Sequence, residues 1–529
     1  MRSLGIPAAA IAATALLFSH SVPAQPAVET LGKVHFETSC TPEAAAAFDR
    51  AMLFQHSFWY RASQRSFEVA LKADPGCAIA YWGIALSLLW NPHAAPPLKN
   101  LADGAAAIAK GKEVGARTER ERDYIAALSA MYADYDKVDH RTRVLNYLKA
   151  MEQLAAKYPD DDEAQIHYAL ALNVGASPSD KTYANQLRGA AILEKIWDRQ
   201  PDHPGIAHYL IHLYDTPALA EKGLMAARRY AKVAPDAPHA LHMPSHIFTR
   251  VGYWQESIDS NAHSASVAKA DRESADQLHA MDYEVYAYLQ LGQDARAKAV
   301  IDEMMTVKGI SETFQAGPYA LAASPARYVV ERGDWKAAAA LQERPGPLAQ
   351  TTAITWFAKA LGAARSGDVA HAQAAISRLM ALRDELREKK DAYWSEQVDI
   401  QAKGAMAWTL LAVGRKDEAL KLMGDTADAE DKTEKSPVTP GPLAPARELY
   451  GAMLLGQGKA GDALAAFEAT LRKEPNRLNG LLGAAAAAQA AGDDAKARQY
   501  YAAATRQASD ASVDRAGIVK ARAFLAGAK

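Results

Sequence analysis

Apolar and polar positions alternate with a helical period along most of this chain, and a larger pattern repeats at a constant interval. Pro201 and Pro235 stand one such interval apart, and each ends a helical run that is followed by another. Gly458 and Gly492 repeat at the same interval near the other end. A period of about 34 residues is typical of two-helix units that stack on one another, because a single hairpin cannot bury its apolar face. The pattern therefore predicts an all-α chain of helical hairpins.

Apolar residues at spacings of three and four predict amphipathic helices over most of the chain. They are expected at residues 42–58, 60–74, 79–90, 98–114, 119–132, 140–158, 162–173, 183–199, 255–269, 275–291, 295–307, 405–413 and 417–423. We assign residues 25–41 to a lead segment, 42–423 to the main array and 446–529 to a C-terminal pair of repeats. Within the last part, residues 512–526 are expected to cap the open end of the array.

The stretch at residues 424–445 differs from the helices around it. It is acidic at first and then rich in proline, with Thr439-Pro440-Gly441-Pro442 near its end. Proline fixes φ and lacks a backbone N–H, so this density predicts an extended segment. Two interpretations are open: a plain linker, or a segment that lies back across the concave surface of the array.

The N-terminus has the features of an export signal. Arg2 precedes an apolar run that is followed by Ser21-Val22-Pro23-Ala24. This pattern predicts a signal peptide at residues 1–24, cleaved after Ala24, and hence a periplasmic or secreted protein. The apolar run is shorter than the ~20 residues that a spanning helix needs, and no later segment is long and uncharged enough. The mature chain is therefore expected to have no membrane span.

Composition narrows the class of partner. The 529 residues carry a net charge of −2 and a pI near 6.7, which offers nucleic acid no sustained basic field. There is also no P-loop, dinucleotide fingerprint, Gly-x-Ser-x-Gly elbow or His-Glu-x-x-His motif. We therefore expect no nucleic-acid partner, and a non-catalytic role is favoured over an enzymatic one.

The chain has only two cysteines, Cys40 and Cys77. Each stands at or just before the start of a first helix, so both should lie at the same end of neighbouring units. In an oxidising compartment they could form a disulfide, provided that their Cα atoms come within about 7 Å. The alternative is a pair of buried thiols.

Histidines gather between residues 204 and 290, where two successive units are in register. Apolar or small residues at positions four, seven, eight and eleven of each first helix are expected to pack inward, which leaves positions two, five, nine and thirteen on the opposite face. That face carries His208 and His212 in one unit, and His239, His242, His246 and Arg250 in the next. The register predicts a patch of imidazoles in a groove.

The polar face extends into the following unit. Matching Gly252 to Gly292 puts His279 in the place of His239, and Asp282 in the place of His242. Pro244 interrupts the second histidine helix: it either bends the helix or marks a late start that leaves His239 and His242 on the preceding loop.

The positions of small, aromatic and proline residues resemble tetratricopeptide repeats (TPR) over most of the mature chain. The block from His208 to Asp215, with Ala237-Pro238-His239-Ala240-Leu241-His242-Met243-Pro244-Ser245-His246-Ile247-Phe248 and Thr439-Pro440-Gly441-Pro442, is similar to a group of exported bacterial TPR proteins. The resemblance implies a right-handed superhelix whose first helices line a concave groove. It implies no particular activity.

Two main hypotheses follow for the histidine face. In the first, an exported scaffold binds a peptide, protein or small ligand in its groove; Arg250 and partly protonated histidines could then hold an anionic group. In the second, the protein is a metal-binding protein or metalloenzyme, because neutral imidazole is the commonest transition-metal ligand. The groove residues are His208, His212, His239, His242, His246, Arg250, His279 and Asp282. The metal ligands would be His208, His212, His242 and His246 with Asp215, for Zn, Cu or Fe.

Two further interpretations remain open. The histidines could be polar packing residues without a ligand, each hydrogen-bonded to a backbone carbonyl or a tyrosine. The protein could also be a structural adaptor of the cell envelope that contacts other proteins through its convex face.

Overall fold

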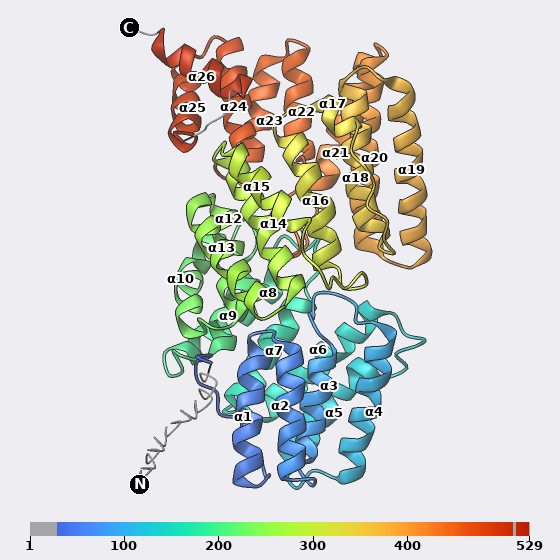
Figure 1. Ribbon diagram of the computed structural model, residues 1–529, viewed down its shortest axis with the longest axis vertical. Helices are drawn as coiled ribbons and strands as arrows, with labels where there is room; N and C mark the ends of the chain where they lie inside the picture. The colour runs from blue at the N-terminus through green and yellow to red at the C-terminus, as the bar shows by residue number, and fades with distance from the viewer. Residues whose placement is uncertain (1–28, 511–514, 528–529) are drawn as a thin grey trace, which may run out of the picture.

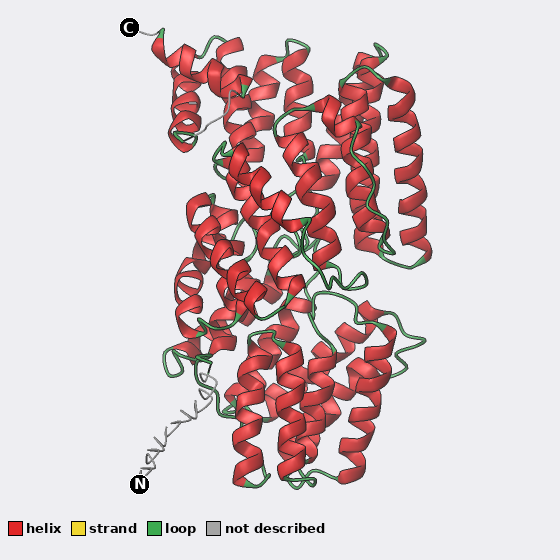
Figure 2. Ribbon diagram, in the orientation of Figure 1, coloured by secondary structure: helices red, strands yellow, loops and turns green. Residues whose placement is uncertain are grey.

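The computed structural model describes residues 29–510 and 515–527, and in these residues it contains helices and loops but no strand (Figures 1 and 2). The protein is an all-α solenoid of TPR-type helical hairpins, as predicted. The proposed signal peptide and its cleavage site after Ala24 lie outside the described residues. Within the described residues, no helix combines the length and apolarity needed to cross a membrane.

The N-terminal third forms the lower part of Figure 1. Its helices begin and end close to the predicted positions, and Thr118, Asp139 and Asp161 cap three of them through side-chain oxygens. They are α1 (Pro42–His56), α2 (Tyr60–Ala73), α3 (Ala78–Leu88), α4 (Leu98–Val114), α5 (Glu119–Tyr132), α6 (His140–Lys157), α7 (Asp162–Val174) and α8 (Ala184–Trp197).

The middle of the chain contains the histidine-rich units. Its elements are α9 (Pro204–Tyr214), the short 3-10 helix η1 (Ala220–Gly223), α10 (Leu224–Val233), α11 (Pro238–His242), α12 (Pro244–Val251), α13 (Trp254–Ala270), α14 (Ser274–Gln290) and α15 (Asp294–Met304). Helix α9 is buried along its whole length. Both faces of this helix therefore lie inside the protein, whereas the sequence predicted one face in an open groove.

The C-terminal half is built in the same way. Its helices are α16 (Ala316–Glu331), α17 (Trp335–Ala339), α18 (Ala349–Arg365), α19 (Val369–Glu388), α20 (Ala392–Ala412), α21 (Lys416–Asp431), α22 (Ala446–Gly456), α23 (Ala460–Lys473), α24 (Leu478–Ala490), α25 (Asp494–Gln507) and α26 (Ala516–Ala526). Helix α20 starts well before the predicted helix at 405, and α21 runs to Asp431. Residues 424–431, expected to begin a linker, are therefore helical, and α26 stands where the cap was predicted.

Small residues let neighbouring helices approach closely, as the repeat pattern requires. A Cβ atom added to Gly83 would come within 2.4 Å of the Phe67 ring, and one added to Gly483 within 2.3 Å of the Phe467 ring. In both pairs the glycine lies on the helix that follows the helix of the phenylalanine, so the same packing recurs near both ends of the chain. A side chain larger than hydrogen would force these helices apart.

The C-terminal helices fold back onto the middle of the array, as the red and yellow-green ribbons of Figure 1 show. Buried Arg477 pairs with Glu331 at 2.6 Å and with Glu448 at 2.7 Å. Gly252, with φ +72°, lies so close to this unit that an added Cβ would be 2.4 Å from the Pro475 carbonyl oxygen. The array is therefore closed on itself at this end.

Residues 433–445, which we call the strap, connect α21 to α22 without helix. The strap is held against the histidine units and α14–α16. The Tyr283 hydroxyl donates to the carbonyl oxygens of Pro437 at 2.9 Å and Thr439 at 3.1 Å, and Arg327 donates to that of Gly441 at 3.2 Å. The proline-rich stretch is therefore not a plain linker: it lies back across the array, which is the second of its two interpretations.

Cys40 and Cys77 form a disulfide, with Cα atoms 5.0 Å apart. It joins a position just before α1 to the residue that precedes α3, at the same end of neighbouring hairpins, as the repeat register predicted.

Candidate functional site

Histidine side chains from α9, α11, α12 and α14 meet in the interior. The helix that contains Pro244 is split: α11 ends at His242, and α12 begins at Pro244. Met243 between them keeps helical φ and ψ of −53° and −35°, so the two pieces remain almost continuous. His239 and His242 therefore stay on a helix rather than on a loop, and they remain in register with His208 and His212 of α9.

The imidazole nitrogens form two groups of three. In the first triad, one ring nitrogen each from His208, His212 and His239 lies within 4.8 Å of the others; in the second triad the same holds for His242, His246 and His279. The triads are neighbours, because the ring centroids of His212 and His246 are 6.0 Å apart. The sequence predicted one set of four histidines. The structure brings those four histidines together, but each i, i+4 pair has its own third histidine: His239 joins the pair on α9, and His279 joins His242 and His246.

The hydrogen bonds of the second triad determine which nitrogens carry protons. His242 Nδ1 lies 2.7 Å from Oδ1 of Asn261, whose amide nitrogen donates to the Ser257 carbonyl. His246 Nδ1 lies 2.9 Å from the Asp215 carboxylate. Both Nδ1 atoms therefore donate, and a neutral imidazole then has a bare Nε2.

These two bare Nε2 atoms are 3.0 Å apart. Two lone pairs at this distance repel each other unless a cation lies between them or beside them. Orientation of Nδ1–H by a carboxylate or an amide oxygen is also how metal-binding histidines are commonly held. The geometry of the second triad is therefore suited to bind a cation through Nε2.

The first triad has a similar arrangement. His208 Nδ1 donates to the backbone carbonyl of His56 at 2.7 Å, and its Nε2 is 3.1 Å from Nε2 of His212. His239 Nε2 is buried and has no hydrogen-bond partner among the described residues. The same is true of Nε2 of His93, whose ring centroid lies 4.6 Å from that of His212. Unpaired buried nitrogens are costly, and a bound ion would satisfy them.

Burial lowers the pKa of all six triad histidines, and the pKa values of His208 and His279 fall to about 3. Neighbouring imidazoles lower the pKa of five of them further, because two adjacent imidazolium ions would repel. At His246 the pKa is lowered further by Lys435 and Arg250, whereas Asp215 raises it. The six rings are therefore neutral at pH 7, which is the form that binds metal ions.

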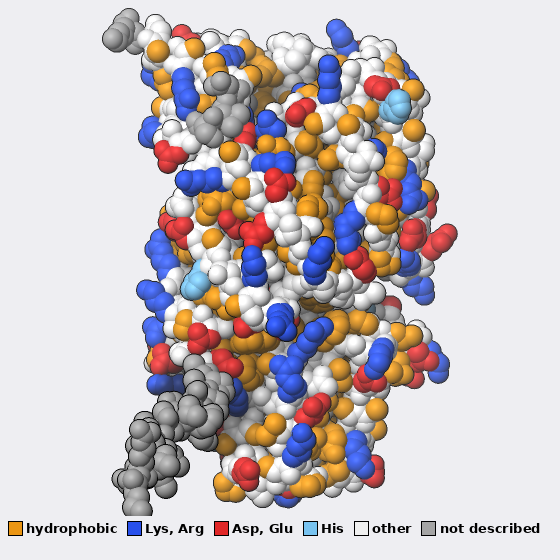
Figure 3. All heavy atoms as spheres, in the orientation of Figure 1, with side chains coloured by type: hydrophobic (Ala, Val, Ile, Leu, Met, Phe, Trp, Pro, Cys, Tyr) orange, Lys and Arg blue, Asp and Glu red, His pale blue; other side chains and the backbone are white. Residues whose placement is uncertain are grey.

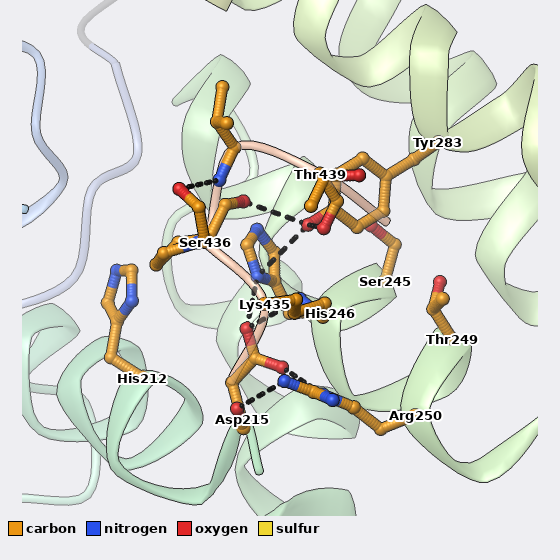
Figure 4. Close-up of polar contacts among 12 residues, drawn as sticks. His212, Asp215, Ser245, His246, Thr249, Arg250, Tyr283, Lys435, Ser436 and Thr439 are labelled. Carbon is orange, nitrogen blue, oxygen red and sulfur yellow. Dashed lines mark hydrogen bonds and ion pairs between the residues drawn. The ribbon is translucent and has the colours of Figure 1, made fainter. Parts of the chain in front are cut away.

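Asp215 lies beside the triads without belonging to either (Figure 4). Arg250 donates to its Oδ1 at 2.8 Å, and Lys435 of the strap lies 3.1 Å from Oδ2, the oxygen that also accepts from His246. Burial alone would raise the pKa of Asp215, but Lys435 and Arg250 more than offset this and hold the pKa well below its usual range. Asp215 is therefore an ionised acceptor that orients His246.

Arg250 and Asp282 have structural contacts of their own. Arg250 is bound to the carboxylate and the backbone carbonyl of Asp215. Asp282 is fully buried and accepts from the Ser324 hydroxyl at 2.8 Å, with Arg327 at 3.9 Å. Neither residue is among the triad ligands, but Arg250 lies beside the second triad because it shares Asp215 with His246.

Most of the triad histidines are buried. Lys435 is only 3 % exposed, and His208, His212, His242 and His246 are all buried. Figure 4 shows the strap with Lys435 and Ser436 beside His246 and Asp215, and histidine is almost absent from the face of the molecule shown in Figure 3. The third histidine of each triad, His239 in one and His279 in the other, is only half-buried.

Several neighbours of the triads could not be found from repeat register. Asn261 is on the second helix of its hairpin, Lys435 comes from a distant part of the chain, and His56 and His93 belong to irregularly spaced N-terminal units. The only available signal was composition, since the chain has 15 histidines. The position of His167 could not be predicted either; it lies near His56, with ring centroids 5.3 Å apart.

Comparison with known proteins gives no relative from which a function could be transferred. No family model matches the chain, and no curated protein matches it. One similar solved structure is Naa15/Naa10 bound to HypK-THB, with a TM-score of 0.26 and 11 % identity over 92 % of this chain and 92 % of that one. Another is the APC/C hetero-tetramer Cut9–Hcn1, with a TM-score of 0.30 and 11 % identity over 90 % of this chain and 96 % of that one. A human IFIT1 dimer with m7Gppp-AAAA is also similar, with a TM-score of 0.35 and 12 % identity over 89 % of this chain and 96 % of that one. Likenesses this distant carry no inference about function.

Proposed function

We propose that this protein binds transition metal ions at the two histidine triads. The observation that supports the proposal best is the facing pair of Nε2 atoms on His242 and His246, 3.0 Å apart with both Nδ1 atoms committed as donors. A site made only of imidazoles suits zinc or copper, and also iron. Three protein ligands leave coordination positions open on each ion, as in catalytic rather than closed structural sites.

The test is metal content in protein purified without a histidine tag and reconstituted with Zn²⁺ or Cu²⁺. We expect His242→Ala with His246→Ala to lose the metal of the second triad, and His208→Ala with His212→Ala to lose that of the first. The exposed His263 and His371 provide a matched control, since replacing both should leave the metal content unchanged. Folded wild-type protein that binds neither metal would contradict the proposal.

A second candidate function is recognition of an extended, proline-containing peptide or protein segment in the position of the strap. Its support is that α14 and α16 bind the strap mainly through its backbone carbonyls, which any peptide offers. The test replaces residues 433–442 by a Gly/Ser linker of equal length and adds a synthetic peptide of the natural sequence. Micromolar binding that Arg327→Met abolishes would support this function, and no binding would exclude it.

The site of action proposed is outside the cytoplasm, in the periplasm or after secretion. The disulfide between Cys40 and Cys77 supports this location, because such bonds persist in oxidising compartments. Fractionation of cells that express the full-length chain, with sequencing of the mature N-terminus, tests both the location and cleavage after Ala24.

A further inference from the structure

A third cluster of metal-ligand groups lies on the N-terminal side of the triads. It contains His56 at the end of α1, Glu163 and His167 on α7, and His203 just before α9. One ligand atom each from His56, Glu163 and His167 lies within 4.8 Å of the others. All four residues are buried, so three elements that are distant in sequence bring their polar side chains to one interior point.

The carboxylate of Glu163 is at the centre of this cluster. Its Oε2 is 3.0 Å from His56 Nε2 and 3.8 Å from His167 Nε2, and its Oε1 is 2.9 Å from His203 Nε2. The described residues place no lysine or arginine in an ion pair with Glu163. Of its two oxygens, Oε2 is the one that faces both His56 Nε2 and His167 Nε2.

Two histidines around Glu163 each have a buried ring nitrogen without a hydrogen-bond partner among the described residues, Nε2 of His167 and Nδ1 of His203. His167 is 2 % exposed, and its Nε2 faces the Glu163 carboxylate without a hydrogen-bond partner among the described residues. His56 Nδ1 is 3.0 Å from the Tyr209 hydroxyl and its Nε2 is 3.0 Å from Glu163 Oε2, so both of its ring nitrogens have a partner. The cluster thus has two imidazole Nε2 atoms and one carboxylate oxygen that converge, with His203 holding the other carboxylate oxygen.

We propose that His56, Glu163 and His167 form a further metal site, separate from the two triads, for a divalent first-row transition ion. Two imidazoles and one carboxylate are a ligand set for Zn²⁺ or Fe²⁺. The ion takes up the unpaired Nε2 of His167 and replaces the contact between His56 Nε2 and Glu163 Oε2 by two bonds to the metal. In this site His203 orients the carboxylate, and Tyr209 accepts the Nδ1–H of His56.

The site has a structural consequence, because it joins α1, α7 and the start of α9. His56 also takes part in the first triad through its backbone, since its carbonyl oxygen accepts from His208 Nδ1 at 2.7 Å. A metal at this site therefore fixes the residue that orients a triad ligand. We expect the N-terminal helices to be held more firmly against α9 when the ion is bound.

The experiment uses the full-length, untagged chain, stripped with chelator and reloaded with Zn²⁺, with zinc counted per chain. His167→Ala should contain one equivalent fewer than wild type, and Glu163→Gln should show the same loss, while the exposed control His263→Ala keeps the wild-type content. Zinc content equal to wild type in folded His167→Ala would overturn this site and leave the triads unaffected; a wild-type chain that takes up no zinc would overturn both.

Crystals of zinc-loaded wild-type protein keep the test decisive if the variants fail to fold. An anomalous difference peak at the zinc edge between His56 Nε2, His167 Nε2 and the Glu163 carboxylate would support the site. Absence of that peak from a structure in which these side chains are ordered would overturn it.

Discussion

His242 Nε2 and His246 Nε2 face each other at 3.0 Å, and in neutral rings that are protonated at Nδ1 neither of these nitrogens carries a proton. Asn261 and Asp215 accept the Nδ1 protons of the two rings, so the neutral rings present lone pairs to one another. In a site built only for packing, one ring would turn so that an N–H met a lone pair. The arrangement therefore favours a cation at this point more strongly than histidine content alone does.

The amide of Asn261 orients His242, so its removal should weaken metal binding without removing a ligand. We expect Asn261→Leu to lower the affinity of the second triad about 10- to 100-fold. Asn261→Asp keeps an acceptor at the same position and should retain most of the affinity. Competition with a chromophoric chelator measures both; equal affinity in wild type and Asn261→Leu would show that the Asn261 contact does not support a metal ligand.

The Tyr283 hydroxyl holds the strap through two backbone carbonyls. Removing it in Tyr283→Phe keeps the ring but leaves these carbonyls without their donor, at a cost of about 1–3 kcal/mol. Amide hydrogen exchange in residues 433–442 should become faster, and chelators should extract metal more quickly. The exposed Tyr253, replaced in the same way, is the control. Unchanged exchange in the strap would mean that other contacts hold it.

The disulfide should contribute to the stability of the N-terminal hairpins. It closes a loop with a sequence separation of 37, and the loop-entropy relation gives about 4 kcal/mol for a loop of this size. Cys40→Ser with Cys77→Ser, or reduction of the wild type, should lower the free energy of unfolding of this part of the chain. Urea denaturation followed by tryptophan fluorescence measures the change, and a difference below about 1 kcal/mol would contradict the expectation.

Glu284 gives the folded protein a pH dependence of its own. Burial raises its pKa to about 7, from 4.5 in the unfolded chain. The folded state therefore binds the Glu284 proton more tightly than the unfolded chain does. The contribution of this proton to the free energy of unfolding is complete below pH 4.5 and is lost as the pH rises through 7. Glu284→Gln should therefore gain up to about 3 kcal/mol over wild type at pH 8 and much less at pH 5.

Urea midpoints of metal-free protein at the two pH values measure the effect of Glu284, with exposed Glu256→Gln as the control. If Glu284→Gln raised the free energy of unfolding by the same amount at pH 5 and pH 8, the Glu284 carboxyl group would not titrate between these pH values.

The solenoid was predictable because its signals are local and repeated. Glycines, aromatics and prolines that recur at a fixed interval determine hairpin packing, as Gly483 against Phe467 illustrates. Register also brought His208, His212, His242 and His246 to one place, since neighbouring units stack in a fixed relation. The third ligands and the orienting groups were not predictable in the same way. Asn261 reaches His242 across a hairpin, and Lys435 reaches Asp215 from 220 residues away.

Closure of the array was the other feature that periodicity could not predict. An open solenoid and a closed one have the same hairpin pattern, and they differ only in long-range contacts such as that of Arg477 with Glu331. This is why the sequence suggested an open groove for the histidines, whereas in the structure four of the six triad histidines are buried and residues 433–445 lie beside Asp215 and Tyr283.

The most direct test of the metal-binding account is a crystal structure of the untagged protein loaded with Zn²⁺ or Cu²⁺, with data collected at the absorption edge of the metal. The account predicts an anomalous peak within bonding distance of Nε2 of both His242 and His246, about 2.0–2.1 Å for zinc. A structure of metal-saturated crystals with no peak there, and with one of these imidazoles turned to donate to the other, would contradict it.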